Sequence, residues 1–219
     1  LNSDDYMGFT PDPSEAGTFF GSGHPETGGN AGFIVSRDGA ETWEQLAPGA
    51  DGPVDFHAIA VSAADSDVIF GLYGNVQVSR DGGKTWAVAG APPADVYDLA
   101  ASSTDPDTVY AATGIGLMVS RDGARTWEPS GPVGRPASLV EVAPAGTVYA
   151  FVIGSGLLRR SASDGEWQSL RRERAAASRC RPRRPRPALR RHAGEPNPDQ
   201  PGWRQKLGRV HLLRRAPRP

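Results

Sequence analysis

The stretch "SRDGGKTW", Ser79–Trp86, has two near-copies elsewhere in the chain. "SRDGAETW" begins at Ser36, "SRDGARTW" begins at Ser120, and a contracted copy, "SDGEW", begins at Ser163. The tryptophans that close these copies are Trp43, Trp86, Trp127 and Trp167. They are spaced 43, 41 and 40 residues apart. A fixed period in this range is typical of stacked supersecondary units.

Each unit around an octet has the same internal order. An apolar segment such as "HAIAVS" (from His57) leads through an Asp-rich turn to a β-branched run such as "VIFGLY". A glycine turn, a third short segment and the octet follow. Alternation and β-branched content favour strands throughout. Four short strands per 40 residues or so are typical of a β-propeller blade. We therefore predict an all-β propeller fragment of four blades in residues 1–170, the first beginning near Met7.

The residue types of the octet suit a folding role. Asp-Gly occupies a hairpin tip, where glycine accepts a positive φ. Ser and Asp oxygens can satisfy turn amides, and Trp can pack its large apolar face on a neighbouring strand. One copy per blade also fits a repeated structural constraint better than repeated catalysis. The predicted structural residues are Ser36, Asp38, Trp43, Ser79, Asp81, Trp86, Ser120, Asp122, Trp127, Asp164 and Trp167.

The octets resemble the Asp-box, or BNR, repeat of the sialidase-like superfamily. That repeat occurs in sialidases, sortilin-type receptors, some xyloglucan-cleaving glycosidases and photosystem II stability factor-like proteins. The surrounding segments "DDYMGFT", "SGHPE" and "DFHAIAV" are most similar to exported bacterial Asp-box propellers labelled glycosyl hydrolases. The resemblance covers residues 1 to about 170. It implies a propeller fold and an extracytoplasmic location (periplasmic, cell-surface or secreted).

The ends of the chain raise separate expectations. Because the first residue is Leu1 rather than Met, we expect the N terminus to be a fragment edge. A signal peptide or membrane anchor upstream of it stays open. No apolar run approaches the ~18 to 20 residues of a membrane span. The single cysteine, Cys180, lies in the tail, so disulfides are not expected in the propeller.

Charge divides the chain near Leu170. Residues 1–170 carry 8 Lys and Arg against 22 Asp and Glu, whereas residues 171–219 carry 16 against 3. An Arg/Pro-rich tail of this kind is typical of a disordered arm that binds nucleic acid. A reading-frame error is the alternative. A shift by one base makes Gln200–Gly208 compatible with another octet, "SRDGGKSW", and brings its Trp on period. We favour the frame error, and expect no nucleic-acid partner and a lost fifth blade.

The turns of an antiparallel meander alternate between its two ends. The octets share one end with the turns between first and second strands. The loops between second and third strands share the other end with the segments between blades; we call this end the rim. Irregular loops carry function more often than regular turns do, so we expect function at the rim. The longest such loop, Gly21–Gly32, holds His24 and Glu26.

Alignment of the repeats places Met7, His57, Tyr97 and Ser138 at one position, where the innermost strand begins. The residues that we expect to bind a glycan or protein partner at the rim are His24, His57, Tyr97 and Arg135. The net charge of −14 over residues 1–170 favours a cationic partner, or solubility alone.

Three functions compete for the rim. A glycoside hydrolase needs two carboxylates, ~5 to 5.5 Å apart for retention or ~6.5 to 9.5 Å for inversion, and Glu26, Asp55 and Asp98 are the candidates. A sialidase is disfavoured, because the early Arg-Ile-Pro motif is absent and Arg37, Arg80 and Arg121 lie in the octets.

A binding or assembly module needs only a shaped surface. A metal site at His24 and His57 lacks any spacing signature, so we predict neither metal nor cofactor. We favour the binding module and leave glycoside hydrolysis as the alternative.

Overall fold

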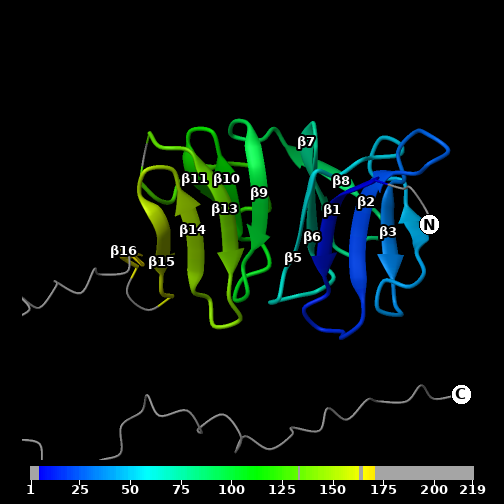
Figure 1. The fold of residues 1–219 in the computed structure, drawn as a ribbon, viewed down its shortest axis with the longest axis horizontal. Coiled ribbons are helices and arrows are strands. Elements are labelled where there is room, and N and C mark those ends of the chain that lie inside the picture. The colour runs from blue at the N-terminus through cyan, green and yellow to red at the C-terminus, as the bar shows by residue number, and fades with distance from the viewer. Residues whose placement is uncertain (1–4, 133, 163–164, 171–219) are drawn as a thin grey trace, which may run out of the picture. The chain divides into compact units, whose positions relative to one another are not determined.

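The computed structural model describes residues 5–132, 134–162 and 165–170. These residues form four antiparallel sheets of four strands each, and they contain no helix (Figure 1). The strands are β1 (Asp5–Pro11), β2 (Phe19–His24), β3 (Phe33–Ser36), β4 (Glu44–Ala47), β5 (Ala58–Val61), β6 (Ile69–Tyr73), β7 (Asn75–Ser79), β8 (Ala87–Gly90), β9 (Val96–Ala101), β10 (Val109–Thr113), β11 (Gly116–Ser120), β12 (Glu128–Pro129), β13 (Ala137–Val142), β14 (Val148–Val152), β15 (Gly156–Arg160) and β16 (Trp167–Ser169).

Each sheet is a meander in which neighbours in sequence are neighbours in space. Sheet 1 is β1–β4, sheet 2 is β5–β8, sheet 3 is β9–β12 and sheet 4 is β13–β16. The all-β architecture and the four blades predicted from the octet period are confirmed. The basic tail and Asp164 lie outside the described residues. Within those residues, we find no helix long and apolar enough to cross a membrane.

Burial along the strands reflects the stacking of the sheets. Every residue of β10 and β11 is buried, because sheets 2 and 4 cover the two faces of sheet 3. Strands buried on both faces form nearly continuous apolar runs. β14, in contrast, alternates buried and more exposed residues, since only sheet 3 packs on it among the described sheets.

Three apolar clusters hold consecutive sheets together. Phe33 and Ile69 belong to the cluster between sheets 1 and 2. Val76 and Val109 belong to the one between sheets 2 and 3, and Leu117 to the one between sheets 3 and 4. The first strands β1, β5, β9 and β13 contact one another in that order. This is the sheet arrangement of consecutive propeller blades around a shared axis.

The octet tryptophans lie at these boundaries. The Trp86 ring centroid lies 5.0 Å from that of Phe33 and 4.7 Å from that of Phe56, both N-terminal to sheet 2. Trp127 and Trp167 pack on the two following clusters in the same way. Trp43 contacts Tyr6 and Phe9 of its own sheet instead, at centroid distances of 5.6 and 6.2 Å. Each tryptophan except the first therefore joins its sheet to the preceding one.

The octet aspartates hold their own turns. Asp81 accepts hydrogen bonds from the Ser79 hydroxyl (2.9 Å), the Thr85 amide (2.8 Å) and the Thr85 hydroxyl (2.7 Å). Asp38 and Asp122 make the same bonds in their turns. The threonine hydroxyl and amide lower the pKa of Asp38 and Asp81 to about 2 and that of Asp122 further. Hydrogen bonds to the charged form of a carboxylate have this effect.

Candidate binding rim

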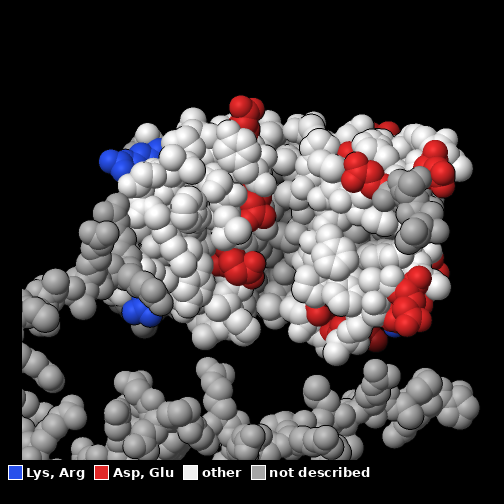
Figure 2. Space-filling view, in the orientation of Figure 1, with Lys and Arg blue, Asp and Glu red and all other residues white. Residues whose placement is uncertain are grey.

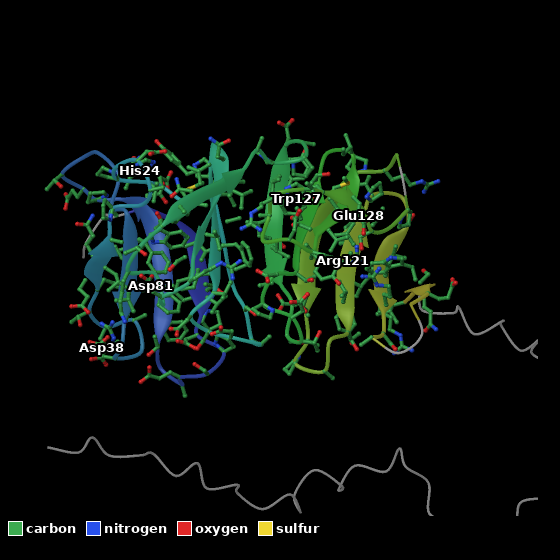
Figure 3. The ribbon with its side chains drawn as sticks, turned by 180° about the vertical axis from the view of Figure 1, so that it is seen from behind. His24, Asp38, Asp81, Arg121, Trp127 and Glu128 are labelled. Carbon is green, nitrogen blue, oxygen red and sulfur yellow. The ribbon has the colours of Figure 1, made fainter. Side chains whose placement is uncertain are left out.

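The two ends of the sheets differ in structure. The octet turns of sheets 1 to 3 each have seven residues and are internally hydrogen-bonded, whereas the rim connections vary from the single residue Gly74 to the ten residues 48–57. Figure 3 shows His24 and Asp38 at opposite ends of the strands of sheet 1. The rim and the octets are therefore separate surfaces.

The first strand of three sheets is bulged where it reaches the rim. The pairing of β1 with β2 skips Met7, that of β9 with β10 skips Tyr97, and that of β13 with β14 skips Ser138. In sheet 2 the equivalent residue, His57, precedes β5, and its amide donates to the Leu72 carbonyl at 3.0 Å. A bulge redirects a side chain out of the ladder. Tyr97 is 54% exposed, so its ring lies open to solvent at the rim.

A buried carboxylate joins two histidines at the same end. Asp55 is 2% exposed and lies in the segment between sheets 1 and 2. Its Oδ2 lies 3.1 Å from Nε2 of His24 and 3.0 Å from Nε2 of His57. Its Oδ1 is buried and has no hydrogen-bond partner. The structure thus brings together three residues that the sequence placed in two different blades.

The contacts of His24 indicate which ring nitrogen carries a proton. Nδ1 of His24 lies 3.0 Å from the Gly29 carbonyl, which only accepts, so Nδ1 carries a proton. The other ring nitrogen, Nε2, faces the Asp55 carboxyl group. The Gly29 carbonyl and, after it, the Asp55 carboxylate raise the pKa of His24.

Ser22, which the sequence alone did not indicate as a site residue, positions the segment between sheets 1 and 2. Its buried hydroxyl accepts from the Phe56 amide at 2.8 Å and donates to the Gly32 carbonyl at 2.8 Å. One side chain of β2 therefore fixes both the end of the long loop and the residue next to Asp55. An alternating serine in an apolar strand was the only sequence signal for this role.

Asp98 has a different environment from Asp55. Its Oδ1 accepts from its neighbour's amide, Leu99, at 3.0 Å, and its Oδ2 accepts from the Val140 amide of sheet 4 at 2.9 Å. Burial, with a smaller contribution from Glu141, raises the pKa of Asp98. Asp98 and Glu141 line a cavity of about 400 Å³ between the first strands. Figure 2, which looks onto the first strands of the sheets, shows acidic side chains beside the hollow in the middle of the view.

Two further predicted rim residues are Arg135 and Glu26. Arg135 Nη1 donates to the Ser155 hydroxyl at 3.4 Å. Glu26 is exposed on the long loop. At the octet end, Arg37, Arg80 and Arg121 form ion pairs with Glu44, Asp107 and Glu128. Among the residues that the structure describes, no group of three or more His, Cys, Asp or Glu side chains is placed to hold a metal ion.

No protein-family model and no curated protein matches the chain. Solved structures do match. The xyloglucanase of family GH74 from Xanthomonas campestris is 21% identical, with a TM-score of 0.57, over 76% of this chain and 30% of that one. YCF48 bound to D1 peptide is 16% identical, with a TM-score of 0.53, over 76% and 55%. The WD40 repeats of RRP9 are 8% identical, with a TM-score of 0.54, over 77% and 51%.

These similarities concern the fold. The chain spans about a quarter to just over half of the length of the structures it matches. The matched proteins include enzymes and a peptide-bound protein, so the shared architecture does not distinguish between these activities. The four sheets are consecutive blades of a β-propeller.

Proposed function

We propose that the chain is a binding or assembly module whose partner, a protein segment or a glycan, contacts the rim. The observation that carries this proposal is the bulge repeated in β1, β9 and β13, which presents an exposed side chain from each of these three first strands at one end of the sheets. Met7 and Tyr97 are 50% and 54% exposed there. An exposed aromatic side chain such as Tyr97, at a surface away from the octets, suits recognition of a peptide or sugar.

The state of the rim carboxylates supports binding over catalysis. Asp55 is covered by two histidines, and Asp98 accepts two backbone amides. A hydrolase needs its carboxyl groups facing the bond to be cleaved. The peptide-bound state of YCF48, which shares the fold, shows that such a propeller can hold a peptide. Membership of the Asp-box propellers and an exported location are part of this proposal, and the Ser–Asp–Thr hydrogen bonds of the octets support the membership.

Immobilised peptide and glycan arrays test the proposal. We expect one array to retain the chain, and Tyr97→Ala to weaken that binding about tenfold, as truncation of an interface aromatic does. Val88→Ala is the matched control, since Val88 is an exposed apolar residue of β8 away from the rim. Failure to bind on both arrays would overturn the proposal.

Glycoside hydrolysis is the second candidate because Asp98 and Glu141 share a cavity and burial raises the pKa of Asp98. A raised pKa suits a general acid. Release of aryl alcohols from generic aryl glycosides, lost in both Asp98→Asn and Glu141→Gln, would favour this candidate over the binding module.

A further inference from the structure

Exposed apolar side chains recur where the second and third strands of sheets 2, 3 and 4 meet at the rim. Tyr73, Ile115 and Ile153 lie at these three turns and are 43%, 52% and 50% exposed. Sheets 2 and 4 cover both faces of sheet 3, so the exposure of Ile115 is a property of its turn and not of an uncovered sheet. A repeated set of exposed apolar residues at one end of the sheets marks an interaction surface.

Close contacts join the rim of sheet 3 to the rim of sheet 4. The Tyr97 ring lies against Gly114, where an added Cβ would be 3.2 Å from the tyrosine oxygen, and Ile115 is the next residue. An added Cβ on Gly116 would be 3.6 Å from the carbonyl oxygen of Arg135. Tyr97, Ile115 and Arg135 therefore belong to one continuous surface.

The same surface continues into the rim turn of sheet 4. Nη1 of Arg135 would lie 3.1 Å from a Cβ added to Gly154, the residue after Ile153. The guanidinium is thus placed beside the last exposed apolar residue of the set. We name Tyr97, Ile115, Arg135 and Ile153 together the arginine patch.

Arg135 gives this patch a positive charge that the described residues do not neutralise. Its guanidinium makes one hydrogen bond, at 3.4 Å to the Ser155 hydroxyl, and no ion pair with a carboxylate of the described residues. The other described Lys and Arg residues lie in the octets or at the octet end of β15. Figure 2 shows basic side chains at the rim end over sheet 4 and acidic side chains over the preceding sheets. Arg135 therefore has N–H donors available for a partner.

The composition of the arginine patch suits a protein segment better than a glycan. A sugar ring can stack on Tyr97, but Ile115 and Ile153 offer only aliphatic surface, which is buried most favourably against other apolar groups. A guanidinium forms its strongest hydrogen bonds with a carboxylate. Asp95, exposed two residues before Tyr97, disfavours a carboxylate at that end of the patch.

Resting on the rim-binding function proposed above, we propose that the partner is a protein segment in which apolar side chains adjoin a carboxylate. The apolar side chains contact Tyr97, Ile115 and Ile153, and the carboxylate pairs with the guanidinium of Arg135. The net charge of −14 over residues 1–170 would by itself favour a basic segment. A preference for an acidic residue is therefore a local effect of Arg135.

An array of matched peptides tests the partner. Each probe carries two leucines and one variable residue, Glu, Gln or Lys, in both orders, within a background of Gly and Ser. We expect the whole chain to bind the Glu peptides about tenfold more tightly than the Gln peptides, as a hydrogen bond to a charged group does, and the Lys peptides most weakly. Equal binding of the Glu and Gln peptides, or strongest binding of the Lys peptides, would overturn the proposal.

Arg135→Gln decides whether the preference arises at the rim, because residues 171–219 carry 16 further Lys and Arg. This variant should bind the Glu and Gln peptides equally. Arg125→Gln is the matched control, since Arg125 is exposed and its guanidinium makes one hydrogen bond, at 3.0 Å to the Asp122 carbonyl, but lies in an octet. This control should keep the Glu preference. A preference that survives in Arg135→Gln, or disappears in both variants, would rule out the assigned role of Arg135.

Ile115→Ser tests the apolar half of the patch. It should weaken the binding of all three kinds of peptide by a similar factor, about tenfold, because it removes apolar contact area and no charge. Unchanged binding would exclude Ile115 from the contact. Circular dichroism of the three variants establishes that their sheets form.

The outcomes distinguish this inference from the proposed function on which it rests. Peptide binding that is weakened by Tyr97→Ala but shows no preference dependent on Arg135 would support rim binding and exclude the acidic partner. Binding on a glycan array alone would exclude a protein partner while leaving the rim-binding function in place. No binding on either array would remove both.

Discussion

At the residue scale, the second residue after the aspartate of each of the three full octets has a positive φ, although the surroundings of the three residues differ. Ala40, Gly83 and Ala124 have φ of 70°, 87° and 69°. Ala40 is exposed, whereas Ala124 is buried in the cluster between sheets 2 and 3. A Cβ on Gly83 would lie 2.2 Å from Cε1 of Phe33. Phe33, larger than Val76 at the same place in the next sheet, is therefore the reason that this octet needs glycine.

Gly83→Ala should lower the free energy of unfolding by about 2–3 kcal/mol, because the added methyl group overpacks a closed boundary. Urea unfolding followed by tryptophan fluorescence measures this loss. Ala40→Gly, at an exposed tip of the same shape, should change stability by less than about 1 kcal/mol. In the double variant Phe33→Val, Gly83→Ala, the loss from the added methyl group should be smaller than in the Phe33 background. An equal loss in both backgrounds would exclude the proposed clash.

Because the pKa values of the octet aspartates are lowered, we expect the protein to lose stability in acid. The pKa of Asp81 is lowered from 3.8 to about 2 by the Thr85 hydroxyl and amide. A lowered pKa contributes stability that is present above the unfolded value and is lost as the pH falls through the folded value. The thermal midpoint should therefore fall between about pH 4 and pH 2, with a shallower fall in Asp81→Asn. Equal pH profiles for the two proteins would contradict this contribution.

At the element scale, the long rim loop is tied to the next segment by the His24–Asp55 contact. The pKa of His24 is raised, so the stabilisation is complete below the unfolded pKa and is lost as the pH rises through the folded one. Besides Asp55 and the Gly29 carbonyl, Asp5 also raises the pKa of His24, while desolvation lowers it. His57 shares the Asp55 oxygen.

Hydrogen exchange of residues 25–32 should show this dependence. We expect stronger protection of the loop, relative to the octet turns, at about pH 5.5 than at about pH 8, on either side of the ordinary histidine range. In His24→Gln the difference between the two pH values should disappear. His57→Gln is the comparison, since His57 lies on the segment after Asp55 and has no contact with the Gly29 carbonyl in the structure. An unchanged pH difference in His24→Gln would rule out the histidine as its source.

The elements that the sequence predicted well are those fixed by local chemistry. The octet turns are formed by Ser, Asp, Gly and Thr within eight residues, and the strands follow from the alternation of apolar and polar residues. Both patterns can therefore be recognised in the sequence alone. The meeting of His24, Asp55 and His57 depends on how sheet 1 lies beside sheet 2, which local patterns do not encode. Asp98 illustrates the same limit. It was a candidate acid from its place near the rim, but its partner, the Val140 amide, lies 42 residues away in the next sheet.

At the scale of the whole molecule, stability resides in the boundaries between sheets. A chain of repeated units is stabilised by contacts between neighbouring units. The loss of a contact that joins two sheets should therefore lower the free energy of unfolding more than the loss of a contact within one sheet. Trp86 contacts Phe33 and Phe56 across the first boundary. Trp43 has the same place in its octet but contacts only Tyr6 and Phe9 of sheet 1 among the ring pairs of the described residues.

Trp86→Ala should therefore lower the free energy of unfolding by about 3 kcal/mol, as deletion of a large core side chain does, whereas Trp43→Ala should cost about 1 kcal/mol. Urea unfolding followed by far-ultraviolet circular dichroism compares the two variants. If Trp43→Ala is as costly as Trp86→Ala, the octet tryptophan stabilises its own sheet rather than the boundary before it.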